Sequence, residues 1–261
     1  MSKQHFVNKD SIVKQIWGKS DTILFIFAGA SAEFALNKAV DWLYFTGKLP
    51  KDPIGRLFTT VSYARQIVFS DKESAKHAID TMTKIHSNVE AKRGYNIPDW
   101  AYRDVLFMLI DYSIRAYELL ERKLTFKERE EVFNVLFNVG EGMNIKGLPK
   151  TFSEWETMRH NHLKENLEHS NYTQDLHKQY RKHLGFLRYY VLLETQKLLV
   201  PTEVYKLLSF KRKSILKPLV VVYKWSRYLQ LDWIFKAMLL PPQYKTQIKS
   251  LDIANTRLAF K

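Results

Sequence analysis

The sequence predicts an all-α fold, a single helical domain that ends in a helical C-terminal extension. Apolar residues recur three and four positions apart along most of the 261 residues, which is the period of a helix with one buried face. Three segments match the capping box that begins helices, namely SDKE (Ser70–Glu73), TFKE (Thr125–Glu128) and TFSE (Thr151–Glu154). No segment of the sequence shows the strict alternation of a half-buried strand.

The first long apolar segment, residues 23–32, predicts a helix in the core. Its ten residues are uncharged and are followed by Glu33, whereas about 20 apolar residues are needed for a helix that crosses a membrane. A buried helix therefore explains this segment better than a transmembrane one.

A second helix is expected over residues 55–69, which begin with GRLFTT. Arg56 and Thr60 are four residues apart and share a mixed stripe with Tyr63 and Ile67, beside an apolar stripe. An arginine near a helix start often satisfies a neighbouring carboxylate. The spacing alone therefore leaves both a structural and a ligand-binding role open.

The next predicted helix begins near Ser70 and carries a histidine on its apolar face. His86 lies four residues after Met82 and three before Val89, on the predicted buried stripe, whereas His77 lies on the polar face. Such a histidine is either a hydrogen-bonded core residue or a metal ligand. Zinc and non-haem iron need several protein ligands, but a haem iron needs only one imidazole because the porphyrin supplies four nitrogens.

Three further helices are expected after this one. One begins at Pro98, and the other two begin at the capping boxes of Thr125 and Thr151. The last of these contains HNHLKENLEH, and we interpret its His160 and His162 as surface residues because they point to different sides of a helix.

The breaks between the helices are short and polar, so the sequence predicts one domain. We expect a helical core over residues 1–165 and an extension over residues 166–261 that packs on it. Pro241 and Pro242 separate the final helix from the helix before it.

Composition excludes several kinds of protein. The chain has no cysteine, which excludes disulfides, cysteine-bound zinc and thiol catalysis. It contains neither G-x-x-x-x-G-K-[ST] nor G-x-G-x-x-G, and no pair of E-x-x-H motifs for a di-iron site. Its N-terminus lacks the apolar stretch of a signal peptide, so we expect a cytoplasmic protein.

The formal charge of +14 is concentrated in the C-terminal part. Residues 1–150 carry 22 basic and 18 acidic residues, whereas residues 151–261 carry 19 and 9. Such a basic face either attracts polyanions or is only a well-solvated surface. Residues 211–242 mix apolar, aromatic and basic residues, which fits an amphipathic helix at a membrane surface or a plain surface helix. We expect no specific nucleic-acid partner.

Four segments of the chain resemble a known oxygenase family. They are similar to the rubber oxygenases (latex clearing proteins) and the MpaB oxygenases of mycophenolic acid synthesis, over roughly residues 15–165. The segments are IWGKSDTILFIFAGASAEF (16–34), GRLFTTVSYARQIVFSDKESA (55–75), IHSNVEAKRGYN (85–96) and MLIDYSIRAYELLERKLTFKEREEVF (108–133). The most specific matches are R-x-x-x-T at Arg56 and Thr60, VFSD at 68–71, H-x-x-V at His86 and Val89, and RAYE at 115–118.

This resemblance implies a globin-like core that binds haem b and uses dioxygen to cleave a carbon–carbon double bond in isoprenoid chains. The family's axial histidine matches His86, and its haem-side arginine and threonine match Arg56 and Thr60. The small residues at 28–32 would then let a helix approach the flat cofactor, or would only pack tightly against another helix.

Three positions depart from the family's pattern. Thr59 stands where the rubber oxygenases have a lysine, Ser70 stands in place of a usual glycine, and Asn37-Lys38 stands in place of His-Pro. The chemistry on the open side of the haem, and hence the substrate, does not carry over from the family.

The sequence as a whole predicts a haem-b-dependent oxygenase, an oxidoreductase whose iron is held by His86 alone. Its partners would be dioxygen and a hydrophobic small molecule, isoprenoid or aromatic, with peripheral contact to a membrane surface. No catalytic residue is assigned. The alternative is a non-enzymatic helical protein that docks through its basic C-terminal face on anionic membrane or nucleic acid.

Overall fold

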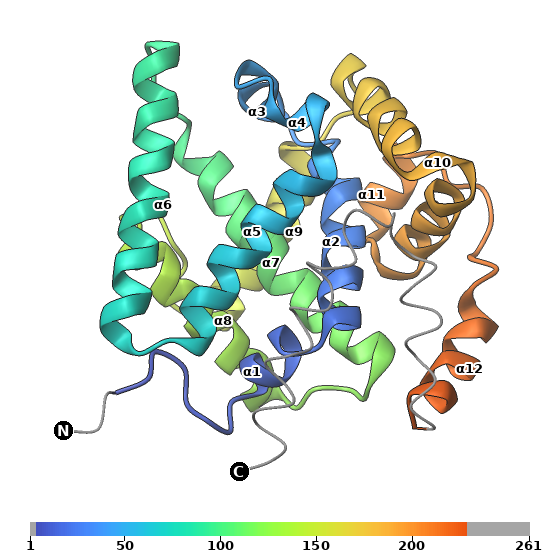
Figure 1. Cartoon of the computed structure of the whole chain (residues 1–261), viewed down its shortest axis with the longest axis horizontal. Coiled ribbons are helices and arrows are strands. Elements are labelled where there is room, and N and C mark those ends of the chain that lie inside the picture. Colours follow the sequence, from blue (N-terminus) through green and yellow to red (C-terminus); the bar gives the residue numbers. More distant parts are fainter. Residues whose placement is uncertain (1–3, 229–261) are drawn as a thin grey trace.

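The computed structural model describes residues 4–228, which form twelve helices and no β-strand (Figure 1). The predicted all-α single domain is confirmed. In chain order the helices are α1 (Ile12–Trp17), α2 (Ser20–Phe34), α3 (Asp41–Phe45), α4 (Lys48–Lys51), α5 (Pro53–Phe69), α6 (Lys72–Arg93), α7 (Asp99–Leu120), α8 (Phe126–Gly142), α9 (Phe152–Glu165), α10 (Asn171–Leu199), α11 (Thr202–Leu207) and α12 (Lys217–Tyr228).

Helices α2 and α7 form the centre of the molecule (Figure 1). The prediction of a core helix over residues 23–32 is confirmed, since Ile23 and Ile26 are fully buried. Gly29 lies against the buried ring of Tyr112 on α7, and a Cβ at Gly29 would be 2.4 Å from Cδ1 of Tyr112. At this glycine the small-residue run therefore serves close packing between two helices.

Helices α5 and α6 lie on one side of this central pair, and α10 and α12 lie on the other (Figure 1). Helix α10 packs against α2 and α7, and its Leu176, Tyr180 and Leu184 belong to the same apolar core. Residues beyond 165 thus contribute to that core, and the division at residue 165 stays a prediction. Among residues 4–228, no helix has the length and apolar character to span a membrane.

The helix starts follow the predicted caps with one exception. Thr125 forms the full capping box with Glu128. Thr151 accepts a hydrogen bond from the Glu154 amide, but the Glu154 carboxylate bonds to the Lys150 amide instead of closing the box. The prediction that Ser70 caps α6 is wrong: the Asp71 carboxylate accepts from the Ser74 amide at 3.0 Å. Pro241 and Pro242 lie outside the described residues.

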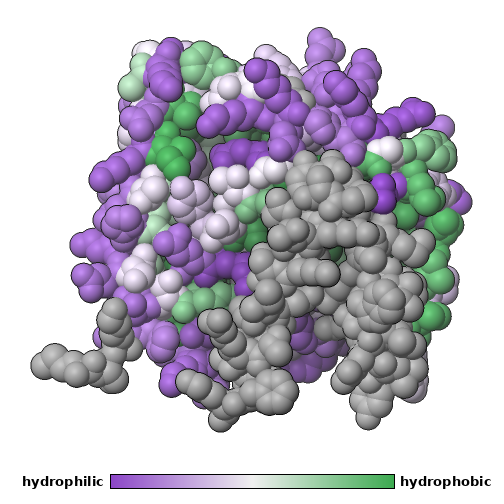
Figure 2. Space-filling model, in the orientation of Figure 1, coloured by the Kyte–Doolittle hydropathy of each residue, from purple (hydrophilic) through white to green (hydrophobic). Residues whose placement is uncertain are grey.

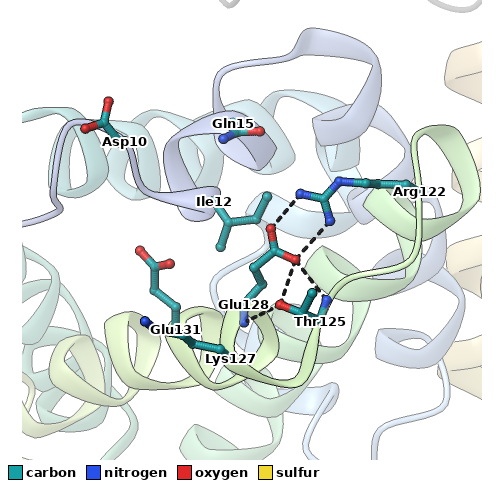
Figure 3. Close-up of a pocket in the computed structure, with 8 residues that line it drawn as sticks. All are labelled: Asp10, Ile12, Gln15, Arg122, Thr125, Lys127, Glu128 and Glu131. Atoms are coloured by element: carbon teal, nitrogen blue, oxygen red, sulfur yellow. Dashed lines mark hydrogen bonds and ion pairs between the residues drawn. The ribbon is translucent and has the colours of Figure 1, made fainter.

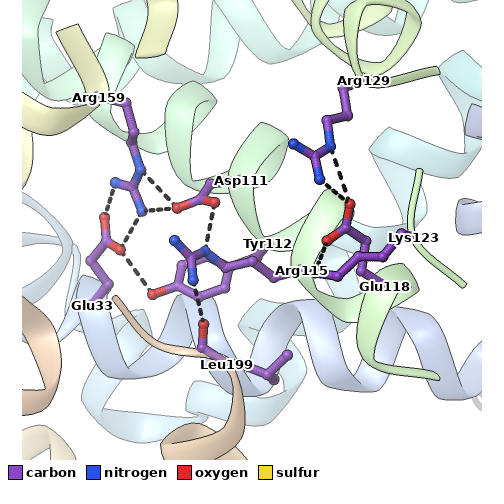
Figure 4. Close-up of polar contacts among 9 residues, drawn as sticks. All are labelled: Glu33, Asp111, Tyr112, Arg115, Glu118, Lys123, Arg129, Arg159 and Leu199. Carbon is purple, nitrogen blue, oxygen red and sulfur yellow. Dashed lines mark hydrogen bonds and ion pairs between the residues drawn. The ribbon is translucent and has the colours of Figure 1, made fainter. Parts of the chain in front are cut away.

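A buried ion network joins α2, α7 and α9 (Figure 4). The Arg159 guanidinium donates to Glu33 at 2.6 Å and to Asp111 at 2.9 Å, and all three residues are buried. Burial alone would raise the pKa of Glu33, but the charge and hydrogen bonds of Arg159, together with His162, outweigh it and hold that pKa at about 2. Tyr112 donates to the same carboxylate at 2.9 Å.

The interpretation of His162 as a surface residue is wrong. His162 is 3% exposed, whereas His160 is exposed as expected. Its Nε2 lies 2.9 Å from a Glu33 oxygen and its Nδ1 lies 2.7 Å from an Asp104 oxygen. Burial would lower the pKa of His162, but the bonds to Asp104 and Glu33 outweigh it and raise that pKa. An imidazole that donates from both nitrogens is a cation, so His162 completes the charge balance of the network.

We predict that Arg159→Met lowers the free energy of unfolding by about 3–5 kcal/mol, because it removes the buried cation that Glu33 and Asp111 share. Urea denaturation of the two proteins measures this difference. Arg122→Met is the matched control, since Arg122 makes a bidentate pair with Glu128 at the surface and its loss should change stability much less. An equal decrease in the free energy of unfolding in both variants would contradict the claim that the buried network contributes more than a surface ion pair.

A second prediction concerns pH. The pKa of His162 is raised in the folded chain, so its contribution to stability is complete below the unfolded value of about 6.5 and is lost as the pH rises through the folded value. The free energy of unfolding should therefore fall more steeply above about pH 6.5 in the natural protein than in His162→Gln. Parallel pH profiles from urea denaturation would show that His162 is neutral in the fold.

Candidate functional site

The residues matched to the haem site lie on α5 and α6, which pack against each other near the turn at residues 70–71 and diverge from there (Figure 1). Helix α5 carries Arg56 and Thr60 in its first two turns, and α6 carries His86 in its C-terminal half. The buried stripe of α6 is complete only in its first half, at Ala75 and Ile79. Around His86 the helix is half-buried, so this face is less covered by protein than the periodicity predicts.

His86 is oriented by its own helix. Its Nδ1 lies 2.9 Å from the carbonyl oxygen of Met82, and because a carbonyl only accepts, Nδ1 carries the hydrogen. Nε2 is then the unprotonated nitrogen of the neutral ring. Within residues 4–228 no protein group bonds to this Nε2.

Arg56 is a half-buried cation whose charge acts on this imidazole. No carboxylate pairs with its guanidinium in the described part of the chain. Burial lowers the pKa of Arg56, and only Tyr63 opposes this effect. A half-buried charge without a counter-charge is unfavourable, so the position of Arg56 fits an anionic ligand.

The same surroundings keep His86 neutral. Burial lowers the pKa of His86, the hydrogen bond to Met82 raises it, the charge of Arg56 lowers it further and Glu90 raises it. The net effect is a pKa below 6.5, so the neutral ring predominates at pH 7. A neutral imidazole is the form that binds iron.

Thr60 lies one turn after Arg56 on α5 and is half-buried. Its hydroxyl donates to the Arg56 carbonyl at 3.3 Å, which leaves the oxygen able to accept a further bond. Thr59, the position of the family's lysine, is exposed and donates to the Gly55 carbonyl at 3.0 Å. The structure thus brings Arg56 near His86, with Thr60 alongside.

Sequence reasoning missed two neighbours of His86. The Tyr102 ring on α7 meets the His86 ring edge to face, with centroids 5.3 Å apart. Its hydroxyl donates to Glu90 at 3.1 Å, and the same carboxylate oxygen accepts from the Ile97 amide at 2.9 Å. Glu90 follows His86 by four residues on α6, and that spacing was the available signal.

These observations fit a haem better than a metal bound by protein alone. In the described ranges no group of three or more His, Cys, Asp or Glu residues is placed to hold a metal ion. A neutral imidazole with a free Nε2 could hold a haem iron, and an arginine that lacks a carboxylate could pair with a propionate.

Two other family motifs have structural roles. In RAYE, Arg115 pairs with Asp111 at 2.6 Å, and Glu118 accepts from Lys123 and Arg129 across the turn into α8 (Figure 4). In VFSD, Asp71 caps α6. Asn37, in place of the family's histidine, is buried and donates to Asp104 at 3.3 Å.

A shallow pocket of about 390 Å³ lies elsewhere, between α1 and the start of α8 (Figure 3). Arg122 and Glu128 in its wall bond to each other, and Thr125 bonds to Glu128. Three of its polar residues are thus occupied by the start of α8, and we assign no chemistry to this pocket.

Comparison with known proteins gives one match. The model of a family described as "ER-bound oxygenase mpaB/B'/Rubber oxygenase, catalytic domain" matches residues 18–247. No curated protein and no solved structure matches the chain.

The effect of the Arg56 charge on His86 can be tested without any cofactor. We predict that in the haem-free protein His86 titrates below 6.5 and that Arg56→Gln raises its pKa, because a nearby positive charge is removed. NMR of the histidine ring protons measures the titration. Arg65→Gln removes a charge from the same helix and should leave the value unchanged. An unchanged pKa in Arg56→Gln would place Arg56 away from His86.

Proposed function

Because the chain belongs to the catalytic-domain family of the ER-bound oxygenases mpaB/B' and the rubber oxygenases, we propose that it is a haem-b-dependent oxygenase with one axial ligand, His86. The family itself implies an oxidoreductase that uses dioxygen and a substrate. The cofactor, its ligand and the kind of substrate are our proposals.

One observation carries the cofactor proposal. His86 presents an unprotonated Nε2 that no described protein group uses, and next to it Arg56 has no carboxylate partner. His162 in the core has both nitrogens satisfied, whereas His86 combines an unused Nε2 with a nearby cation that lacks a carboxylate. An iron and an anionic propionate are the two partners that these two side chains lack.

Each residue then has a definite task. His86 would hold the iron through Nε2, with its ring fixed by the Met82 carbonyl and the edge of Tyr102. Arg56 would neutralise a haem propionate by a charge-assisted bond, and Thr60 would offer its hydroxyl at the haem edge. The globin-like character of the core belongs to the same proposal.

When bound, haem b supplies the iron at which dioxygen is activated. The protein's own contribution is to orient the imidazole, to balance the propionate charge and to exclude water from the reacting substrate. We propose a hydrophobic substrate, isoprenoid or aromatic, on the ground of family membership. No residue is assigned as a base. The division of the chain at residue 165 and a cytoplasmic location are likewise proposals.

We predict that His86→Ala retains little haem after reconstitution, whereas His77→Ala retains as much as the natural protein. Both histidines are on α6, but His77 is exposed on its polar face, so the pair separates ligation from general effects on the helix. The Soret absorbance per protein measures retention. Added imidazole should restore haem binding to His86→Gly, because free imidazole replaces the lost ligand.

Circular dichroism of each variant controls for folding. Equal haem retention in folded His86→Ala and His77→Ala would remove His86 as the ligand.

A further inference from the structure

Of the thirteen large apolar side chains that are exposed among the described residues, seven lie in two segments on one side of the molecule. These segments are the bend of α10 and the stretch that leads into and forms α12. The exposed side chains are Phe186, Leu187, Ile215, Leu219, Val221, Val222 and Trp225. Figure 2 shows hydrophobic side chains gathered along the edge of the molecule where, in Figure 1, this bend and α12 lie. A gathered apolar surface of this kind marks an interaction site, unlike single exposed residues.

The backbone conformation at Gly185 exposes the first segment, the bend of α10. Gly185 interrupts α10 with φ 73° and ψ 172°, a conformation that residues with a Cβ rarely adopt. The bend turns Phe186 and Leu187 outward, where they are 71% and 66% exposed. The Arg181 guanidinium lies 5.7 Å from the Phe186 ring centroid, so a positive charge lies close to this exposed ring.

Helix α12 is held by one face and open on the other. Val220 and Tyr223 are buried, and the Tyr223 hydroxyl donates to Asp21 at 2.9 Å. Leu219, Val222 and Trp225 follow one another at intervals of three residues and are 51%, 54% and 69% exposed. The anchored inner face fixes the position of the helix, and the apolar outer face is exposed.

The two segments themselves are basic. Residues 176–193 and 204–225 contain ten lysines and arginines and no aspartate or glutamate, and of these Arg212 pairs with the buried Glu194. Lys182, Lys213 and Lys217 are exposed beside the apolar residues. Two copies of this face would repel each other, and a nucleic acid would leave the apolar side chains in water. An anionic lipid surface satisfies both the charges and the apolar groups.

We propose that the bend of α10 and the outer face of α12 form a docking surface for an anionic membrane. The protein binds there peripherally, with Phe186 and Trp225 entering the interface and the surrounding lysines contacting lipid headgroups. This inference does not depend on haem, so the haem-free chain binds in the same way.

The test uses the full chain and vesicles of equal parts phosphatidylserine and phosphatidylcholine. Sedimentation measures binding, and it should weaken as salt is added because part of the attraction is electrostatic. The double variant Phe186→Ser/Trp225→Ser should bind at least about tenfold more weakly, since two large apolar contacts are lost. Phe126→Ser is the matched control, because Phe126 on α8 is 64% exposed away from this surface, and it should bind like the natural protein.

Each contrary result overturns the proposal. No binding to these vesicles, or equal binding to pure phosphatidylcholine, would exclude anionic lipid as the partner. Unchanged binding by the double variant would place the contact elsewhere. A dimer in light scattering that the double variant converts to a monomer would show that a second copy covers the surface. Retention on DNA with none on vesicles would assign the face to nucleic acid.

Discussion

The fold depends on the buried ion network between Glu33, Arg159 and Asp111. It joins α2, α7 and α9 at a point where all three side chains are shielded from water. Such a network is stable only when every charge has its partner, and here the imidazolium of His162 between Glu33 and Asp104 supplies the balance. The network fixes α2 and α7 relative to each other. Helix α6 then packs on α7 at Tyr102, and α10 packs on α2.

The candidate site differs from this network in its charge balance. In the network Arg159 and His162 each have carboxylate partners, whereas Arg56 has none among the described residues. His162 uses both ring nitrogens and His86 uses one. His177 also leaves its buried Nε2 without a partner among the described residues, so what distinguishes His86 is the combination of a free Nε2 with the unpaired charge of Arg56.

The helical fold was predictable because periodicity and capping are local properties of the sequence. Thr125 caps α8 and the segment 23–32 is a core helix, as the adjacent residues in the sequence predict. His162 was not predictable, since HNHLKENLEH reads as polar surface and its partners Glu33 and Asp104 are 129 and 58 residues away in sequence. The same limit applies to Tyr102, whose contact with His86 exists only when α7 packs against α6. The spacing of residues along one helix was enough to identify His86. The charges and hydrogen bonds around it could be identified only from the folded structure.

The central claim is that His86 is the only protein ligand of a bound haem, and the absorption spectrum of the reconstituted protein under carbon monoxide tests it most directly. We predict a ferrous protein whose Soret band shifts rapidly on addition of carbon monoxide, because no protein ligand has to leave first. A spectrum with two axial histidines that carbon monoxide fails to alter, or a protein that takes up no haem, would contradict the account.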